Sequence, residues 1–342
     1  MTNKQKIFKV VVLLLIVLLN ACHEVGNNQT DKKTDSTSSN LTLKNEQIDK
    51  SGLPSFIGKN AWDICNDFCK IGPRNPNSTG SKKGLKFILD FLKPLSTNVK
   101  EQNFIHDGYN GEKVNLTNVI ATFNPDASKR ILLCTHWDSR PRAEEDSDST
   151  LHNLPILGAN DGGSGTAVLL ELAKILKENP PKFGVDLVFF DGEDYGKEGD
   201  LESYFLGARY FSKNLPIGYK PSFGILLDIV GDHNAIFEKE GFSMEKAPDV
   251  VNVIWNGAND LGLTQFKNIL GGGISDDHYP LNDVANIPTI DIIDIEMVGN
   301  RSNDPNRRYW HTHQDTMDKI SESSLGNVGK LMVYTIYKLT KY

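Results

Sequence analysis

The chain has 342 residues, of which 39% are hydrophobic and 24% are charged, and its formal net charge at pH 7 is −7. This is an ordinary globular composition, with enough chain for one large α/β domain or two small ones. The acidic balance makes nucleic acid an unexpected partner.

The first 22 residues have the pattern of an export signal. Three lysines, at positions 4, 6 and 9, precede an apolar run from Val10 to Leu19 that is too short for a stable membrane-spanning helix. Ala21 and Cys22 follow, and this pair resembles a bacterial lipoprotein cleavage box. We therefore expect an acylated Cys22 at the mature N-terminus of an exported, lipid-anchored envelope protein on the periplasmic, outer-membrane or cell-surface side, because several acyl chains hold a protein on a membrane. The alternative is an ordinary secretory signal with an incidental cysteine.

Residues 23–50 consist largely of Asn, Thr, Ser, Asp and Lys. Such a segment cannot bury a core, so a flexible polar tether is expected there. The catalytic domain is expected over residues 51–342. Three cysteines fall within it, and because this number is odd they cannot all pair as disulfides. Cys65 and Cys69 can pair only if a helix ends between them, and Cys134 is expected to be a buried thiol.

From residue 51 onward, helical and strand-like patterns alternate. In chain order the pattern predicts helices 61–70 and 82–92, strands 114–123 and 130–135, helix 165–176, strand 185–190, helix 203–212, strand 223–230, helix 249–261, strand 289–293 and helix 322–339. Apolar strands that alternate with helices are typical of a largely parallel sheet covered on both faces. We therefore predict an α/β fold, a three-layer α/β/α sandwich around a mostly parallel mixed sheet.

Acidic and imidazole side chains gather where the predicted strands end. They are His136 and Asp138, Glu193 and Asp194, Asp228, Asp277 and His278, and the later His311 and His313. In open α/β sheets the ligand site lies beyond the carboxyl ends of the strands. Carboxylates that crowd together there repel one another unless a cation lies between them. The pattern therefore predicts a divalent metal site at this edge of the sheet.

Each motif alone has an ordinary structural explanation. Asp161, in LGANDGGSG, is either a metal ligand or the N-cap of the next helix. In FFDGEDYG, one of Glu193 and Asp194 can bind metal while the other moves protons, but a solvated polar loop would look similar. The joint occurrence of the motifs on successive strand ends favours a site. A histidine with two carboxylates and an open position is a catalytic zinc pattern, whereas calcium or magnesium prefer all-oxygen sites.

The succession THWDSR, LGANDGGSG, FFDGEDYG, LLDIVGD, SDDHYP and YWHT resembles the zinc aminopeptidase clan. It is most similar to the bacterial glutaminyl-peptide cyclotransferases of the animal type, and the likeness extends over residues 52–342, including IGPRNPNS. The resemblance implies a zinc aminopeptidase-like fold. It also implies a zinc-dependent acyltransferase that converts the N-terminal glutamine of peptides or proteins to pyroglutamate and releases ammonia.

The resemblance implies roles for seven residues: the zinc ligands Asp161, Asp194 and His311, the general acid/base Glu193, the acid network of Asp228 and Asp277, and the pocket wall Trp310. Many members of the family carry Glu-Glu where this chain has Glu193-Asp194. Because Asp is one methylene shorter, the metal is expected to lie nearer the strand end or to bind differently.

Two other functions remain open at the level of sequence. A di-zinc aminopeptidase of the clan uses five ligands, and this chain has a suitable residue at each of those positions: His136, Asp161, Asp194, Asp228 and His311. Trp310 directly before His311, and the pair Asp276-Asp277, favour the cyclase. A cyclase needs only one zinc ion, and His136 and Asp228 are then expected to contact the zinc ligands rather than a metal. The third possibility is a lipoprotein that binds peptides or glycans without chemistry, but such a protein would be expected to lose some strand-end acids. The expected partners are peptides with N-terminal glutamine and a membrane, and a monomer is expected.

Overall fold

The computed structural model describes residues 52–96 and 98–338. These residues belong to one compact unit that runs from Ile48 to Tyr342. The export signal, Cys22 and the tether lie outside the described residues. Within the described ranges, no helix is both long enough and apolar enough to cross a membrane.

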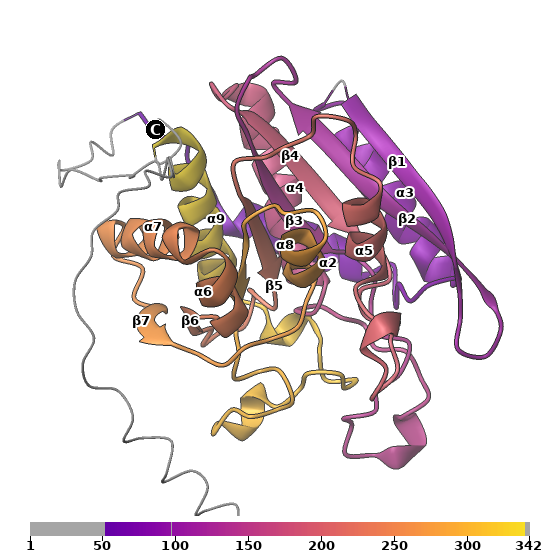
Figure 1. Cartoon of the computed structure of the whole chain (residues 1–342). Helices are drawn as coiled ribbons and strands as arrows, with labels where there is room; N and C mark the ends of the chain where they lie inside the picture. Colours follow the sequence, from indigo (N-terminus) through magenta and orange to yellow (C-terminus); the bar gives the residue numbers. More distant parts are fainter. Residues whose placement is uncertain (1–51, 97, 339–342) are drawn as a thin grey trace, which may run out of the picture. The chain divides into compact units, whose positions relative to one another are not determined.

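A six-stranded sheet forms the centre of this unit (Figure 1). Its strands lie in the order β1 (Asn98–Asp107), β2 (Lys113–Phe123), β4 (Gly184–Phe190), β3 (Arg130–His136), β5 (Gly224–Asp228) and β8 (Thr289–Ile293). The four strands from β4 to β8 are parallel to one another, whereas β1 and β2 are antiparallel to their neighbours. The predicted mostly parallel mixed sheet is confirmed.

Helices cover both faces of the sheet (Figure 1). Successive strand residues point to opposite faces, and β3 shows the consequence. Leu133 packs in a core with α2 (Gly58–Cys69), α3 (Thr79–Leu92), α4 (Gly163–Glu178), α7 (Pro248–Asp260) and α9 (Glu322–Tyr337). Leu132 and Cys134 pack in a second core with α5 (Leu206–Lys213) and α8 (His278–Asp283). The predicted three-layer α/β/α architecture is therefore confirmed.

Several elements escape prediction because their sequences carry no long apolar pattern. Strand β1 is an edge strand with a mixed polar surface, and it pairs with β2 along its whole length. The short elements β6 (Phe237–Lys239), α6 (Gly241–Lys246) and β7 (Phe266–Leu270) lie between β5 and α8 in the chain, and β6 pairs with β7 in a small parallel sheet.

Three helices, α2, α3 and α5, start three residues away from the predicted position, and α2 starts at Gly58. Helix α5 begins at Leu206 rather than at Ser203, because Phe205 takes a left-handed φ of 58° that interrupts the chain after a 3-10 turn. Helix α3 begins at Thr79, and its cap is Ser78, whose hydroxyl accepts a hydrogen bond from the backbone N–H of Ser81. The cap of α9 is Ser321, whose hydroxyl accepts hydrogen bonds from two backbone N–H groups of the first turn.

The three cysteines of the described residues are free and buried. Helix α2 continues without interruption from Gly58 to Cys69, so Cys65 and Cys69 stay on one helix and do not pair. The Cys65 thiol instead contacts the carbonyl of Ala159, at 3.4 Å. Cys134 is the buried thiol that the sequence predicts.

A buried arginine holds two loops of the catalytic edge together. The Arg74 guanidinium is fully enclosed and donates to the carbonyls of Trp137 (2.9 Å), Leu157 (2.8 Å) and Gly158 (2.8 Å). Its backbone N–H donates to the Ser139 hydroxyl (2.9 Å). One of these loops follows β3 and the other precedes α4, so Arg74 fixes the spacing between the two chain segments.

We expect Arg74→Lys to lower the free energy of unfolding by roughly 2–4 kcal/mol, because an ammonium group cannot serve all three carbonyls and an unsatisfied buried acceptor is costly. Urea denaturation followed by circular dichroism would measure the change. The exposed Arg308, which makes a single side-chain hydrogen bond to the Ser302 carbonyl, is the control: Arg308→Lys should change the value by less than about 0.5 kcal/mol. Equal losses in the two variants would contradict the role of Arg74.

Candidate active site

The strand ends bring the polar residues together as the topology requires. His136 is the last residue of β3 and Asp228 the last residue of β5, and these strands are neighbours with the same direction. Glu193 and Asp194 follow the end of the adjacent strand β4. Asp161 lies on the turn before α4. It does not cap that helix, whose N-cap position is taken by Gly162.

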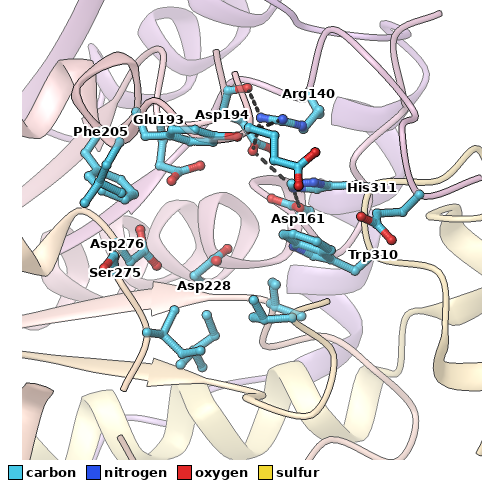
Figure 2. A pocket seen from close by; sticks show the side chains of 18 of the residues that line it. Arg140, Asp161, Glu193, Asp194, Phe205, Asp228, Ser275, Asp276, Trp310 and His311 are labelled. Carbon is cyan, nitrogen blue, oxygen red and sulfur yellow. Dashed lines mark hydrogen bonds and ion pairs between the residues drawn. The ribbon is translucent and has the colours of Figure 1, made fainter. Parts of the chain in front are cut away.

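Three side chains form a compact ligand set. The His311 Nε2 atom lies 3.2 Å from Asp194 Oδ1 and 3.6 Å from Asp161 Oδ2, and one ligand atom from each residue can be chosen so that all three lie within 4.8 Å. Figure 2 shows the three groups converging. All are buried, yet Asp161 Oδ2 and Asp194 Oδ2 have no hydrogen-bond partner. An imidazole with two free carboxylate oxygens is the donor set of a catalytic zinc site.

A second set shares Asp161 with the first. His136 Nε2 lies 3.1 Å from Asp161 Oδ1 and 3.1 Å from Asp228 Oδ1. Its other ring nitrogen lies 3.4 Å from Asp138 Oδ1. The structure therefore brings together all five positions that a di-zinc peptidase would use. Either a second cation or the His136 ring itself can link Asp161 to Asp228.

Burial and neighbouring charges set the ionisation of the central acids. Burial, reinforced by Asp194, raises the pKa of Glu193 well above its ordinary value. Burial and the same neighbour also raise the pKa of Asp161. Burial alone would raise the pKa of Asp194 too, but His311 and Arg140 outweigh it and hold that pKa below the ordinary value. The pKa values of Glu193 and Asp194, which are adjacent in the chain, are therefore shifted in opposite directions. The lowered pKa suits Asp194 to metal binding, and the raised pKa suits Glu193 to proton transfer.

Two acids that the sequence analysis did not assign hold the ligand loops through the main chain. Asp138 accepts hydrogen bonds from the backbone N–H groups of Glu193 and Asp194, both at 3.2 Å. Asp315 accepts from the N–H of Asp161 at 3.1 Å. The position of Asp138 two residues after His136 is a sequence signal for the first. No comparable signal marks Asp315.

Arg140 is a further residue to which the sequence analysis assigned no role. It is almost completely buried and donates to the carbonyl oxygen of Asp194 (2.8 Å), to the Tyr204 hydroxyl (2.9 Å) and to Glu144 (2.8 Å). A second contact, 3.4 Å long, reaches Asp194 Oδ1. The guanidinium therefore stabilises the ionised form of the metal ligand Asp194. The HWDSRP motif contains this arginine, so its place near the site could have been inferred.

These groups open into a cavity of about 390 Å³. Its walls include Glu193, Asp228 and the apolar side chains of Ile229, Ile274 and Ile293. Trp310 lies at the edge of the metal set, with its ring stacked on His311 at a centroid distance of 3.4 Å and an interplanar angle of 19° (Figure 2). The pocket is thus polar around the ligand set and apolar on the side of β5 and β8.

The acid pair before α8 is arranged differently from the expectation. The resemblance places Asp277 beside the substrate, but it is Asp276 that lines the cavity (Figure 2). Asp277 is fully buried next to it, and neither of its carboxylate oxygens has a hydrogen-bond partner. The cause is local: Asp277 leads directly into α8, and this turn buries its side chain. Asp276 is therefore the member of the pair in contact with the pocket.

Backbone strain concentrates at this pocket. Phe205, Ile229 and His311 all line it, and all have positive φ values, of 58°, 49° and 54°. Such values are costly for residues other than glycine, especially for a β-branched residue such as Ile229. The surrounding contacts must hold these residues in place, as is common at functional sites.

Comparisons with known proteins agree with this geometry. The sequence profile of peptidase family M28 matches residues 118–336. A solved structure of glutaminyl cyclase from Bacteroides thetaiotaomicron, with N-acetylhistamine bound, is 38% identical with a TM-score of 0.79, and the match covers 84% of this chain and 99% of that one. A solved Zn-dependent exopeptidase from Parabacteroides distasonis is 37% identical with a TM-score of 0.79, over 84% and 99% of the two chains.

Among curated proteins, a glutaminyl-peptide cyclotransferase from Bothrops jararaca is 25% identical over 293 residues, which cover 76% of this chain and 75% of that protein. The family and its zinc-dependent members imply zinc as the metal, and the donor set of Asp161, Asp194 and His311 fits it. The chain therefore belongs to peptidase family M28, among relatives that include the glutaminyl cyclases.

Proposed function

We propose that the protein is a zinc-dependent glutaminyl-peptide cyclotransferase, which closes N-terminal glutamine of peptides and proteins into pyroglutamate and releases ammonia. The observation that carries this proposal is the pairing of Trp310 with the ligand His311 above a pocket that contains Glu193. The 38% identity to a bacterial glutaminyl cyclase over 99% of its length supports the same activity.

The reaction is intramolecular, because the α-amine attacks the γ-amide carbon of its own residue. The pocket must therefore fold the substrate and stabilise charge rather than collect two molecules. A metal held by Asp161, Asp194 and His311 supplies a Lewis acid for the amide oxygen. Glu193 accepts the proton that the attacking amine loses, and it donates a proton to the nitrogen that leaves as ammonia. Burial raises its pKa above the ordinary value for a glutamate, which favours its taking up a proton and passing it on.

Other residues of the pocket orient the glutamine. Trp310, Ile229 and Ile293 offer apolar surface to the methylene groups of its side chain. Asp276 keeps one buried oxygen without a partner, and we assign to it, rather than to Asp277, the hydrogen bond to the leaving amide nitrogen. Asp228 also lines the pocket, and its carboxylate is hydrogen-bonded to the His136 ring.

One observation favours a second candidate, a di-zinc aminopeptidase. The set of His136, Asp161 and Asp228 is compact enough to hold another metal. However, the resemblance to the cyclases implies a single zinc ion with His136 and Asp228 outside its ligands, and the His136 Nε2 atom lies 3.1 Å from both carboxylates. We therefore propose one zinc ion. All the acids at the strand ends are present, which also argues against a binding protein that catalyses no reaction.

For the location, we propose an envelope lipoprotein, anchored by acyl chains on Cys22 and working as a monomer. The support is the apolar run from Val10 to Leu19 followed by Ala21 and Cys22, with a polar segment after it. Such a segment gives a catalytic domain reach from the membrane surface.

The activity is tested by incubating residues 23–342 and zinc with a Gln-first and a Leu-first tripeptide. We expect loss of ammonia from the first and no change in the second, by mass spectrometry. Glu193→Gln should lower turnover at least about 100-fold, because it removes the proton carrier, and should keep its zinc.

Glu202→Gln is the control, since Glu202 is exposed and pairs with Arg209 outside the pocket. It should retain the wild-type rate. Release of free leucine would instead identify a peptidase. A Glu193→Gln enzyme within a few-fold of wild type would refute the role given to Glu193.

Metal content is the second test of the site. After dialysis, we expect elemental analysis to find one zinc per chain in the wild type and in His136→Asn, and almost none in His311→Ala, because only the latter removes a ligand. Circular dichroism would confirm that each variant is folded. Two zinc ions in the wild type and one in His136→Asn would favour the aminopeptidase.

The anchor is tested in cells. A bacterial host that expresses the full chain with labelled palmitate should incorporate label into the wild type and not into Cys22→Ala, whose protein should leave the membrane fraction. Cys134→Ala, which alters a buried thiol of the second core, should be labelled normally. Label that persists in Cys22→Ala would refute acylation at Cys22.

A further inference from the structure

The wall of the pocket carries an excess of acid. Eight carboxyl groups and two guanidinium groups line it: Glu144, Glu145, Asp161, Glu193, Asp194, Glu198, Asp228 and Asp276 against Arg140 and Arg301. A single divalent metal offsets only two of these charges. Clefts lined by one sign of charge focus the field and concentrate ligands of the opposite sign.

The acids fall into an inner and an outer group. Five of them are buried around the ligand set: Asp161, Glu193, Asp194, Asp228 and Asp276. Glu144 is engaged by Arg140. The carboxylates of Glu145 and Glu198 are exposed at the mouth, and neither has an ion-pair partner within the described ranges. They are therefore the acids free to meet a charged part of a substrate.

The cavity also contains buried oxygens that lack partners. Besides the free oxygen of the metal ligand Asp194, the pocket-lining Asp276, which is only 3% exposed, keeps its Oδ2 atom without a hydrogen bond. The interior therefore has capacity for a polar ligand in addition to the charge at its mouth. A glutamine bound at this depth leaves the next residues of its peptide at the mouth.

The charges at the mouth come from three different loops. Glu145 lies on the loop after β3, where its backbone N–H donates to the carbonyl of His311 (3.4 Å). Glu198 lies on the loop after the neighbouring strand β4. Arg301 follows β8, which β5 separates from β3. Glu145 and Glu198 therefore come from the loops of two neighbouring strands, whereas Arg301 comes from the loop after β8.

From this arrangement we propose that Glu145 and Glu198 select peptides in which the N-terminal glutamine is followed by residues with cationic side chains. The inference rests on the proposed cyclase function and names a substrate class for the same pocket. A lysine or arginine side chain directed toward the loops after β3 and β4 meets two unpaired carboxylates. A glutamate in the same place is repelled by them and by the net negative interior.

The test compares Gln-Lys, Gln-Leu and Gln-Glu tripeptide amides of otherwise equal sequence. At low salt, we expect kcat/KM for the lysine peptide to exceed that for the glutamate peptide roughly tenfold, mainly through KM. The ratio should shrink at about 1 M salt, where the screening length falls to about 3 Å. In Glu145→Gln/Glu198→Gln the ratio should approach one, while the rate with Gln-Leu stays near the wild-type value.

Glu202→Gln is the matched control, because Glu202 follows Glu198 in the same loop but lies outside the pocket and pairs with Arg209. It should keep the wild-type ratio. Turnover of all three peptides with equal kcat/KM, or a ratio unchanged by the double substitution, would overturn the selectivity while leaving the cyclase intact. Absence of turnover with Gln-Leu would overturn the cyclase and the selectivity together.

Discussion

The crowding of carboxylates around Asp161 is the constraint on which this structure depends. One oxygen of Asp161 faces His136 and the other faces His311, while Asp194 and Asp228 approach from either side. Buried like charges at such distances are tolerated only when cations or protons lie between them. In the proposed one-zinc arrangement, zinc at Asp161, Asp194 and His311 and the imidazole of His136 meet that requirement. The parallel strand ends that create the crowding also create the site.

The scaffold holds the ligands by their main chain and leaves their side chains free. Asp138 and Asp315 accept from backbone N–H groups of the ligand loops, and Arg74 donates to backbone carbonyls beside them. Because these supports do not use the ligand oxygens, those oxygens stay available to a metal. The positive φ of His311 shows how much the loop is constrained to present its ring. Hydrogen bonds that hold the ligand-bearing residues in this way determine the geometry of a metal site as strongly as the ligands themselves do.

A cyclase and a di-zinc peptidase can both be built on this edge of the sheet, because this chain has a suitable residue at each of the five positions that the peptidase uses for its metals. The difference lies in what occupies the space between Asp161 and Asp228, and in what closes the pocket. Here His136 already spans the two carboxylates, and Trp310 stacks on the ligand His311. Both features suit a small internal rearrangement of one residue.

The sequence by itself determined the α/β class, the mostly parallel sheet and the position of its polar edge. Long apolar strands and helical periods are local patterns, and parallel topology brings strand ends to a common edge. It also indicated Asp161, Glu193, Asp194 and His311, since each lies in a distinctive motif. Tertiary structure alone decided that Asp276 rather than Asp277 lines the pocket, that Arg140 and Asp315 support the ligands, and that β1 completes the sheet. These outcomes depend on backbone turns and on partners distant in the chain, which local sequence patterns do not encode.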